Sequence, residues 1–225
     1  LESPIPAPAQ DVIFLGINYM AHSDEAEKYS AAAFATKHED AIYFSKRVTR
    51  AVPDGGPIEA HTDLVKKLDY ECELAVVLGR DARDVPAGQT RDYIFGYTIL
   101  NDVSARDVQT AHKQWYFGKS LDGFTPIGPC IVTADAFADY PPRLGIRSFV
   151  NGEKRQDSNT ALQIFDIDHV IAELSQGMTL KAGTIIATGT PAGVGMGMDP
   201  PQFLKPGDVV RCEIEGIGTL TNPVK

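Results

Sequence analysis

The sequence predicts a mostly β protein of the α+β class, with a few helices at its edges. Short runs rich in β-branched and aromatic residues recur along the chain from residue 42 onward. Glycine and proline clusters, such as those at 54–57 and 205–208, separate these runs as turns do. A clear helical pattern with start and stop signals occurs late, near residues 167–176. Together these patterns indicate packed strands with peripheral helices.

The first forty residues contain an extended lead-in, a strand and a polar helix. Residues 1–11 carry prolines at positions 4, 6 and 8 and are predicted to be extended. Residues 12–16 (VIFLG) form a short strand that ends at a glycine. Ala, Glu and Lys dominate residues 21–37, a composition that favours a helix. Because its apolar stripe is weak, we expect the 21–40 segment to pack poorly and to be mobile.

Strands account for most of the remaining chain. A short turn of helix is expected at 90–93, and Asn151-Gly152 predicts a two-residue hairpin turn. Asp166 or Asp168 is the candidate N-cap of the helix at 167–176, and Gly177 is its stop signal. The expected strands cover residues 42–46, 68–79, 94–102, 127–133, 144–150, 184–188, 209–214 and 218–222.

Composition limits the kind of protein this is. The 225 residues suffice for one sizeable domain, and 43% hydrophobic and 23% charged residues are ordinary for a globular chain. A net charge of −9 without a basic stripe argues against nucleic-acid binding. No apolar run approaches the ~18 residues of a membrane span. Cys72, Cys130 and Cys212 fit no disulfide framework or zinc spacing, so we expect buried free thiols in a cytoplasmic protein.

Two glutamates in the apolar run at 68–78 carry the clearest chemical signal. Glu71 and Glu73 are two residues apart, so on a strand their side chains point to the same face. Neighbouring carboxylates repel each other and lose hydration in such a strand, and a divalent cation removes both costs. For an isolated pair, the alternative is a solvated face of an edge strand. The pair predicts a metal site for which the rest of the chain supplies further ligands.

Further polar groups follow at strand ends and in loops, where sites are often built. Asp102 closes a strand and adds a third carboxylate, although a turn or cap role would also suit it. Arg106 and Gln109 suit a carboxylate or an oxyanion, with a structural ion pair as the alternative for Arg106. Lys119 lies in a loop among glycines and aromatic residues. Residues 188–195 (TGTPAGVG) offer backbone N–H groups for an anion.

Five motifs, taken in order, resemble the fumarylacetoacetate hydrolase family over nearly the whole chain. The motifs are GINYMAH at 16–22, LDYECE at 68–73, NDVSARD at 101–107, GKSLDG at 118–123 and TGTPAGVG at 188–195. The resemblance implies a mixed β-sandwich roll, a homodimer, Mg²⁺ or Mn²⁺ as cofactor and a small-molecule 2-oxo acid as substrate. It also implies a catalytic domain over 12–225. Many members carry an N-terminal domain before this segment, so residues 1–11 are interpreted as the remnant of a linker, with a compact form as the alternative.

The resemblance also assigns roles to individual residues. Glu71, Glu73 and Asp102 match the three metal carboxylates, whose oxygens suit a hard cation and leave coordination positions open. His22 and Glu25 resemble a dyad in which the histidine, oriented by the glutamate, activates water as a general base. The remaining matches are Lys119 near metal and substrate, Arg106 and Gln109 at the oxyanion or distal group, and Gly189 and Thr190 at the substrate carboxylate.

These assignments lead to three hypotheses about function. The first is metal-dependent cleavage of a C–C bond next to a carbonyl in a 2-oxo acid, by acylpyruvate- or fumarylpyruvate-type hydrolysis or oxaloacetate-type decarboxylation, through an enolate. The second is an isomerase or tautomerase of a 2-hydroxy-dienedioate. The third, from another class, is a non-catalytic protein that binds a metal or an oxo acid. We expect residues 21–40 to be a lid that closes as a helix and delivers His22 and Glu25.

Overall fold

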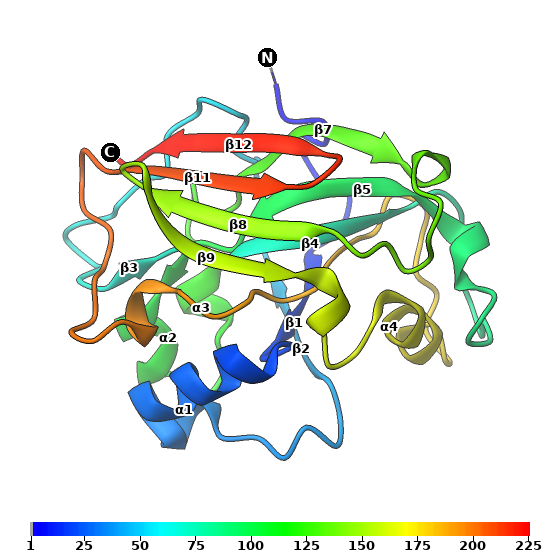
Figure 1. Cartoon of the computed structure of the whole chain (residues 1–225), viewed down its shortest axis with the longest axis horizontal. Coiled ribbons are helices and arrows are strands. Elements are labelled where there is room, and N and C mark those ends of the chain that lie inside the picture. The colour runs from blue at the N-terminus through cyan, green and yellow to red at the C-terminus, as the bar shows by residue number, and fades with distance from the viewer. Residues whose placement is uncertain (1) are drawn as a thin grey trace.

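Two β-sheets packed face to face form the body of the molecule (Figure 1). The computed structural model describes residues 2–225. The larger sheet has the strand order β2-β1-β10-β4-β5-β7; β1 and β10 run parallel, and the other neighbours are antiparallel. Its strands are β1 (Val12–Gly16), β2 (Ile42–Lys46), β4 (Cys72–Leu78), β5 (Ile94–Asn101), β7 (Ile127–Thr133) and β10 (Ile185–Ala187).

The smaller sheet is antiparallel and has the order β12-β11-β8-β9. Its strands are β8 (Gly145–Val150), β9 (Glu153–Asn159), β11 (Val209–Ile214) and β12 (Gly218–Pro223). The turn at Asn151-Gly152 joins β8 to β9, and both residues have positive φ angles, of 52° and 84°. The predicted hairpin is therefore confirmed. A separate two-stranded ladder pairs β3 (Leu68–Asp69) with β6 (Ser104–Ala105).

The helices lie around the sheets. In Figure 1, α1, α2 and α3 gather on one side, and α4 lies apart from them. The α-helices are α1 (Met20–Phe34), α2 (Arg106–Ala111), α3 (Tyr116–Lys119) and α4 (Ile167–Leu174). Short 3-10 turns complete the chain: η1 (Thr90–Tyr93), η2 (Ala134–Ala136), η3 (Thr160–Leu162) and η4 (Gly195–Gly197). Among residues 2–225, no helix is long and apolar enough to cross a membrane.

Strand β4 is buried on both faces and divides the core. Leu74 and Val76 point into the cluster between the two sheets, which also contains Ile146 of β8. Ala75 and Val77 point to the opposite face, into a second apolar cluster. Because strand side chains alternate, Glu73 shares the face of Ala75 and Val77, away from the smaller sheet. The fold therefore directs this glutamate toward the side on which its functional partners lie.

Most predicted elements are confirmed, and the fold class is mostly β with few helices. Helix α4 begins after Asp166, whose side chain accepts the His169 N–H at 2.8 Å, so Asp166 is the N-cap of the two candidates. The strand expected over 68–79 is instead divided into β3 and β4 by a break at Tyr70-Glu71. Strand β9 was not predicted, because its sequence EKRQDSN lacks the apolar alternation of a half-buried strand.

The expectation of three buried thiols is wrong for one of them. Cys72 and Cys212 are buried in the core between the sheets, but Cys130 is exposed. Cys130 lies in β7, the edge strand of the larger sheet, where one flank has no neighbouring strand. An apolar run at a sheet edge is only half covered, which the sequence pattern cannot distinguish from a central strand.

Candidate active site

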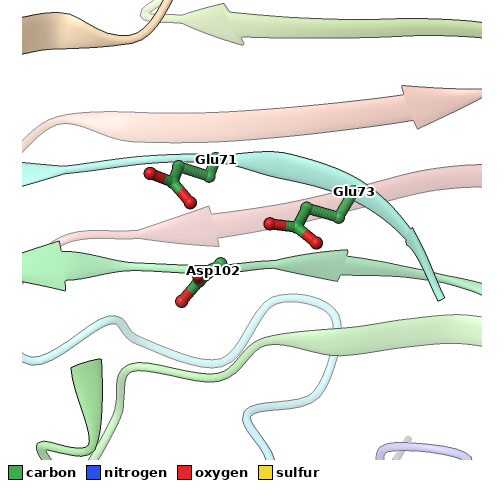
Figure 2. A group of neighbouring side chains, drawn as sticks. All are labelled: Glu71, Glu73 and Asp102. Carbon is green, nitrogen blue, oxygen red and sulfur yellow. The ribbon is translucent and has the colours of Figure 1, made fainter. Parts of the chain in front are cut away.

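Three buried carboxylates converge on one point. Glu71 lies between β3 and β4, Glu73 lies in β4, and Asp102 directly follows β5. Figure 2 shows the three side chains pointing into the same space from adjacent strands. One oxygen atom from each lies within 4.8 Å of the others. The structure therefore brings together the three residues that the sequence predicted as metal ligands.

An irregular backbone at the start of β4 aims the first glutamate. The ladder between β4 and β5 reaches Cys72, which is opposite Asn101. Beyond it, the Glu71 N–H donates to the side-chain oxygen of Asn101 at 3.0 Å. The Glu71 carbonyl accepts the Asp102 N–H at 2.8 Å. Because a side chain replaces a strand partner, Glu71 departs from the ladder and still faces Asp102.

Two predicted cations lie against these carboxylates. Lys119 Nζ donates to Glu71 Oε2 at 2.9 Å and to Asp102 Oδ2 at 2.6 Å. Arg106 pairs with Glu71 Oε1 at 2.6 Å and with Asp69 Oδ2 at 2.9 Å, and both cations are buried. Burial alone would raise the pKa of the Glu71 carboxyl, but Lys119 and Arg106 outweigh it and hold that pKa below its ordinary range. Arg106 thus forms buried ion pairs.

A third cation, Lys46, was not anticipated from the sequence. It ends β2 and is fully buried. Its ammonium donates to Asp102 Oδ1 at 2.7 Å and to the carbonyls of Phe124 and Val103 at 2.7 and 3.1 Å. Burial lowers the pKa of Lys46, and the neighbouring Asp102 opposes but does not cancel this shift. Lys46 therefore fixes one oxygen of Asp102 while Lys119 contacts the other.

Glu73 is the carboxylate of the three that has no cationic partner among residues 2–225. Its Oε2 accepts the backbone N–H of Gly189 at 2.7 Å. Burial, reinforced by the charges of Asp102 and Glu71, raises the pKa of Glu73 well above its ordinary value. The uncompensated charge of the site is therefore concentrated at Glu73.

This charge distribution fits a divalent cation. Three carboxylate oxygens are the hard ligands that Mg²⁺, Mn²⁺ and Ca²⁺ prefer, and the group of Glu71, Glu73 and Asp102 supplies them from two adjacent strands. A bound dication would favour the ionised form of Glu73, the form that the protein-only environment disfavours. The residues present could therefore hold a divalent metal ion.

The proposed histidine–glutamate dyad lies on α1. His22 is buried, and its Nδ1 is 3.6 Å from Glu25 Oε2, longer than a hydrogen bond. Both oxygens of Glu25 accept the backbone N–H of Gly193, at 2.9 and 3.0 Å. The helix packs through Ala26 and Phe34 against the segment that contains η4. The structure thus places His22 in the lining of the site cavity, whereas Glu25 is bound more closely to the 189–197 loop than to His22.

A small cavity of about 10 Å³ lies beside the carboxylates. One side is polar, and the opposite side is closed by Phe34, Phe44 and Trp115, whose rings pack with centroids 5.4–5.5 Å apart. Trp115 therefore forms part of the wall of the site. The polar lining comprises His22, Glu71, Arg106, Gln109, Lys119 and Thr190.

The remaining predicted substrate-binding residues, Gln109, Gly189 and Thr190, have different surroundings. Gln109 and Thr190 line the cavity. The Thr190 hydroxyl donates its proton to the Cys72 carbonyl at 2.9 Å, so this donor is used within the protein. The Gly189 N–H donates to Glu73 and so holds a carboxylate of the metal site. Contact of these residues with a substrate stays a prediction.

Three residues of the site were missed in the sequence. Asp69 accepts the N–H groups of Gly195 and Met196 at 2.7 and 3.0 Å, in addition to pairing with Arg106. Its position two residues before Glu71 was a usable signal, as was the lone lysine that ends the apolar run at Lys46. Gln156 donates to the Thr190 hydroxyl from β9, for which the hairpin turn at Asn151-Gly152 was the one usable signal.

Comparison with known proteins gives consistent matches along the chain. The family described as fumarylacetoacetate (FAA) hydrolase C-terminal matches residues 11–225. An oxaloacetate tautomerase of Bacillus subtilis is 42% identical over 224 residues, covering 100% of this chain and 72% of that protein. A fumarylacetoacetate hydrolase structure from Exiguobacterium antarcticum has a TM-score of 0.87 and 46% identity, covering 97% of this chain and 76% of that one. A Mycobacterium marinum 2-hydroxyhepta-2,4-diene-1,7-dioate isomerase has a TM-score of 0.80 and 40% identity, covering 100% and 77%.

Proposed function

The chain belongs to the fumarylacetoacetate hydrolase family, and on this premise we propose that it is a Mg²⁺- or Mn²⁺-dependent enzyme that acts on a short 2-oxo acid through its enolate. The observation that carries the proposal is the convergence of Glu71, Glu73 and Asp102 beside a closed cavity. The buried side chains of His22 and Lys119 also line that cavity, and groups of this kind can take part in proton transfer.

When bound, the metal ion would act as a Lewis acid toward the keto oxygen and lower the cost of enolate charge. The protein contributes positioning and proton transfer around it. Lys119 is held between Glu71 and Asp102 and presents its positive charge where negative charge develops. Gln109 lines the same cavity and orients the substrate. The aromatic wall excludes water from the reacting atoms.

His22 is the residue that we propose moves the proton. It lines the cavity, is buried, and its Nδ1 has no hydrogen-bond partner in the described protein. The neutral imidazole of a histidine can accept a proton from the carbon next to the keto group and return it elsewhere. Because Glu25 lies 3.6 Å away and is bound by Gly193, His22 reaches the cavity without a tightly bound orienting partner.

This arrangement favours keto–enol tautomerisation of an oxaloacetate-type acid. Proton removal and return need one base and no attacking water, and the buried His22 in the cavity lining supplies that base. The relatives named as a tautomerase and an isomerase match this chain over its full length and support the same choice.

Cleavage of the C–C bond next to the carbonyl is the second candidate. The observation that favours it is the position of Glu25 three residues after His22 on α1, from which a small shift of the helix would bring the carboxylate into hydrogen-bond range. A histidine oriented by a carboxylate can activate water, which hydrolysis requires and tautomerisation does not.

A panel assay with each metal tests these proposals. Purified protein is supplied with Mg²⁺ or Mn²⁺ and with oxaloacetate, acetylpyruvate, fumarylpyruvate or a 2-hydroxy-dienedioate. Tautomerase activity appears as faster enol–keto equilibration without loss of substrate carbon, whereas hydrolysis or decarboxylation releases products. Protein that bound no Mn²⁺ and converted none of these acids would instead be a non-catalytic member of the family.

The His22→Ala variant separates the two reactions. Cleavage by activated water should fall about 10²- to 10⁴-fold, the usual contribution of a general base. Tautomerisation should retain a larger share of its rate, because solvent can take over a proton transfer to or from carbon, whereas cleavage also needs the attacking water to be activated. Equal losses in both reactions would show that one proton-transfer step limits both.

A further inference from the structure

We propose that Gln156, which does not line the cavity, is a positioning residue for the metal carboxylates. The proposal rests on the proposed function, because it takes Glu71 and Glu73 to be ligands of a divalent cation. Gln156 lies in β9 of the smaller sheet and is fully buried. Its side chain crosses to the start of β4 in the larger sheet and bonds to the backbone there.

The need for such a residue arises where β10 ends. The ladder between β10 and β4 stops at Ala75, so the flank of β4 before that residue lacks a neighbouring strand. Two groups of Thr188, its N–H and its hydroxyl, donate to the Leu74 carbonyl at 3.0 and 2.8 Å. Two residues earlier, the Cys72 N–H donates to Gln156 Oε1 at 3.1 Å. Gln156 thus takes the place of a strand partner.

The same amide also fixes the loop after β10. Gln156 Nε2 donates to Thr190 Oγ1 and to the Pro191 carbonyl, both at 2.7 Å. The Thr190 hydroxyl in turn donates to the Cys72 carbonyl at 2.9 Å. One side-chain amide and one hydroxyl therefore satisfy both backbone groups of Cys72, the residue between the two metal glutamates.

The amide can adopt only one orientation in this network. Its oxygen must face the Cys72 N–H and its nitrogen must face the Pro191 carbonyl, because the reversed amide would oppose donor to donor and acceptor to acceptor. An apolar side chain at Gln156 would leave the Cys72 N–H buried without a partner. We expect the start of β4 to shift in response and to change the separation of Glu71 and Glu73.

The expected effect is on metal affinity. Groups that orient metal ligands without touching the ion typically change affinity about 10- to 100-fold when removed. We therefore expect Gln156→Met, which keeps length and burial, to weaken Mn²⁺ binding by about that factor. Binding is measured on the purified full chain by the electron paramagnetic resonance signal of free Mn²⁺ during a titration, which does not depend on turnover.

Asn222→Leu is the matched control. Asn222 is also a buried amide in the smaller sheet, and its Nδ2 donates to the carbonyls of Pro53 and Gly56, each at 2.9 Å. Replacing Asn222 removes hydrogen bonds of a buried amide, as replacing Gln156 does, but the bonds of Asn222 do not involve β4. We expect this variant to bind Mn²⁺ within about threefold of the unmodified protein, a change small against the 10- to 100-fold expected at Gln156.

Two outcomes would overturn the proposal: Mn²⁺ affinity of Gln156→Met within threefold of the unmodified chain, or an equal loss in Asn222→Leu. If Gln156→Met fails to fold, Gln156→Asn replaces it and the readout is the rise in Tm on adding Mn²⁺. A smaller rise than in Asn222→Leu supports the proposal, and an equal rise refutes it. If the unmodified chain itself binds no Mn²⁺, the proposed function fails rather than the role of Gln156 alone.

Discussion

Single charges determine the behaviour of the site at the residue scale. The carboxylates of Asp69, Glu71 and Asp102 each contact a buried cation, and Glu73 has none in the described part of the chain. An ionised carboxylate without a counter-charge is costly to bury. A cation that binds here would lower the free energy of keeping Glu73 buried and ionised. For this reason we treat Glu73 as the centre of the metal site.

The pH dependence of stability follows from the raised pKa of Glu73. The protonated Glu73 carboxyl contributes fully to the free energy of unfolding below the ordinary glutamate pKa of 4.5. This contribution is lost as the pH rises through the higher pKa of the folded state. Gln cannot ionise, so in chelator-treated protein the stability advantage of Glu73→Gln should grow with pH between pH 5 and 8, by at most about 1.4 kcal/mol per pH unit. Urea unfolding at each pH measures this difference. Parallel stability curves for the two proteins would show that Glu73 does not carry the uncompensated charge.

Lys46 should matter more for stability than its sequence position suggests. Lys46→Met removes one partner of the buried Asp102, a change that typically costs about 3–5 kcal/mol. Lys181→Met is the control, because the pair of Lys181 with Asp81 lies on the surface and is screened by solvent. Urea unfolding of both variants tests the difference. The role of Lys46 would be refuted by equal losses of stability.

At the scale of elements, helix α1 and the loop before α3 meet at the aromatic wall. Phe34, the last residue of α1, packs against Trp115, which also packs against Phe44 of β2. Lys119 follows Trp115 by one helical turn, and its Nζ lies 5.1 Å from the centre of the Phe44 ring. Movement of α1 would therefore change the packing around Trp115, in the segment that carries Lys119. We retain the proposal that residues 21–40 are a mobile lid.

Trp115 is the single tryptophan of the chain, so its fluorescence reports on this contact. If α1 opens and closes, adding Mg²⁺ with oxalate, a stable analogue of a 2-oxo acid, should change the emission maximum or intensity of Trp115. Phe34→Ala removes the packing partner from the lid side and should abolish most of that change. An emission spectrum that does not respond to the ligand in the unmodified protein would indicate a fixed helix.

The sequence predicted elements well wherever apolar periodicity was strong. Strands β1, β2, β5 and β7 and helix α4 lie where they were expected. Strand β9 was missed because its polar sequence lacks apolar alternation, and the break between β3 and β4 was missed because it depends on partners far along the chain. Gln156 in β9 and Asn101 at the end of β5 bond to the backbone around Glu71. Side chains of this kind act as strand partners, and no local pattern encodes that role.

At the scale of the whole molecule, the metal carboxylates were predictable and their charge balance was not. Glu71, Glu73 and Asp102 were found because carboxylates interrupt apolar strands. Lys46 and Asp69 become part of the site only through contacts with residues 56 and 37 positions away. Burial depends on the assembled sheets, so the sequence could not show that these ordinary charged residues lie inside the protein.

The homodimer that we propose would use a surface of the folded chain. Strand β7 leaves one flank of the larger sheet unpaired, and its Cys130 is exposed. An edge strand of this kind is a surface on which a second copy could pack. Light scattering during size-exclusion chromatography should give twice the mass of the chain. A single-chain mass at all concentrations tested would contradict the dimer.

Metal-dependent formation of an enolate is the central claim, and proton exchange tests it most directly. In D₂O, proton NMR follows the loss of signal from the hydrogens on the carbon next to the keto group of 2-oxobutyrate. This exchange reports enolate formation whichever bond the enzyme breaks in its natural substrate. With Mg²⁺ present, the unmodified protein should accelerate this exchange well above the rate without protein, and chelator treatment or Glu73→Gln should abolish the acceleration. Exchange that is equally fast without Mg²⁺ and in Glu73→Gln would contradict the account.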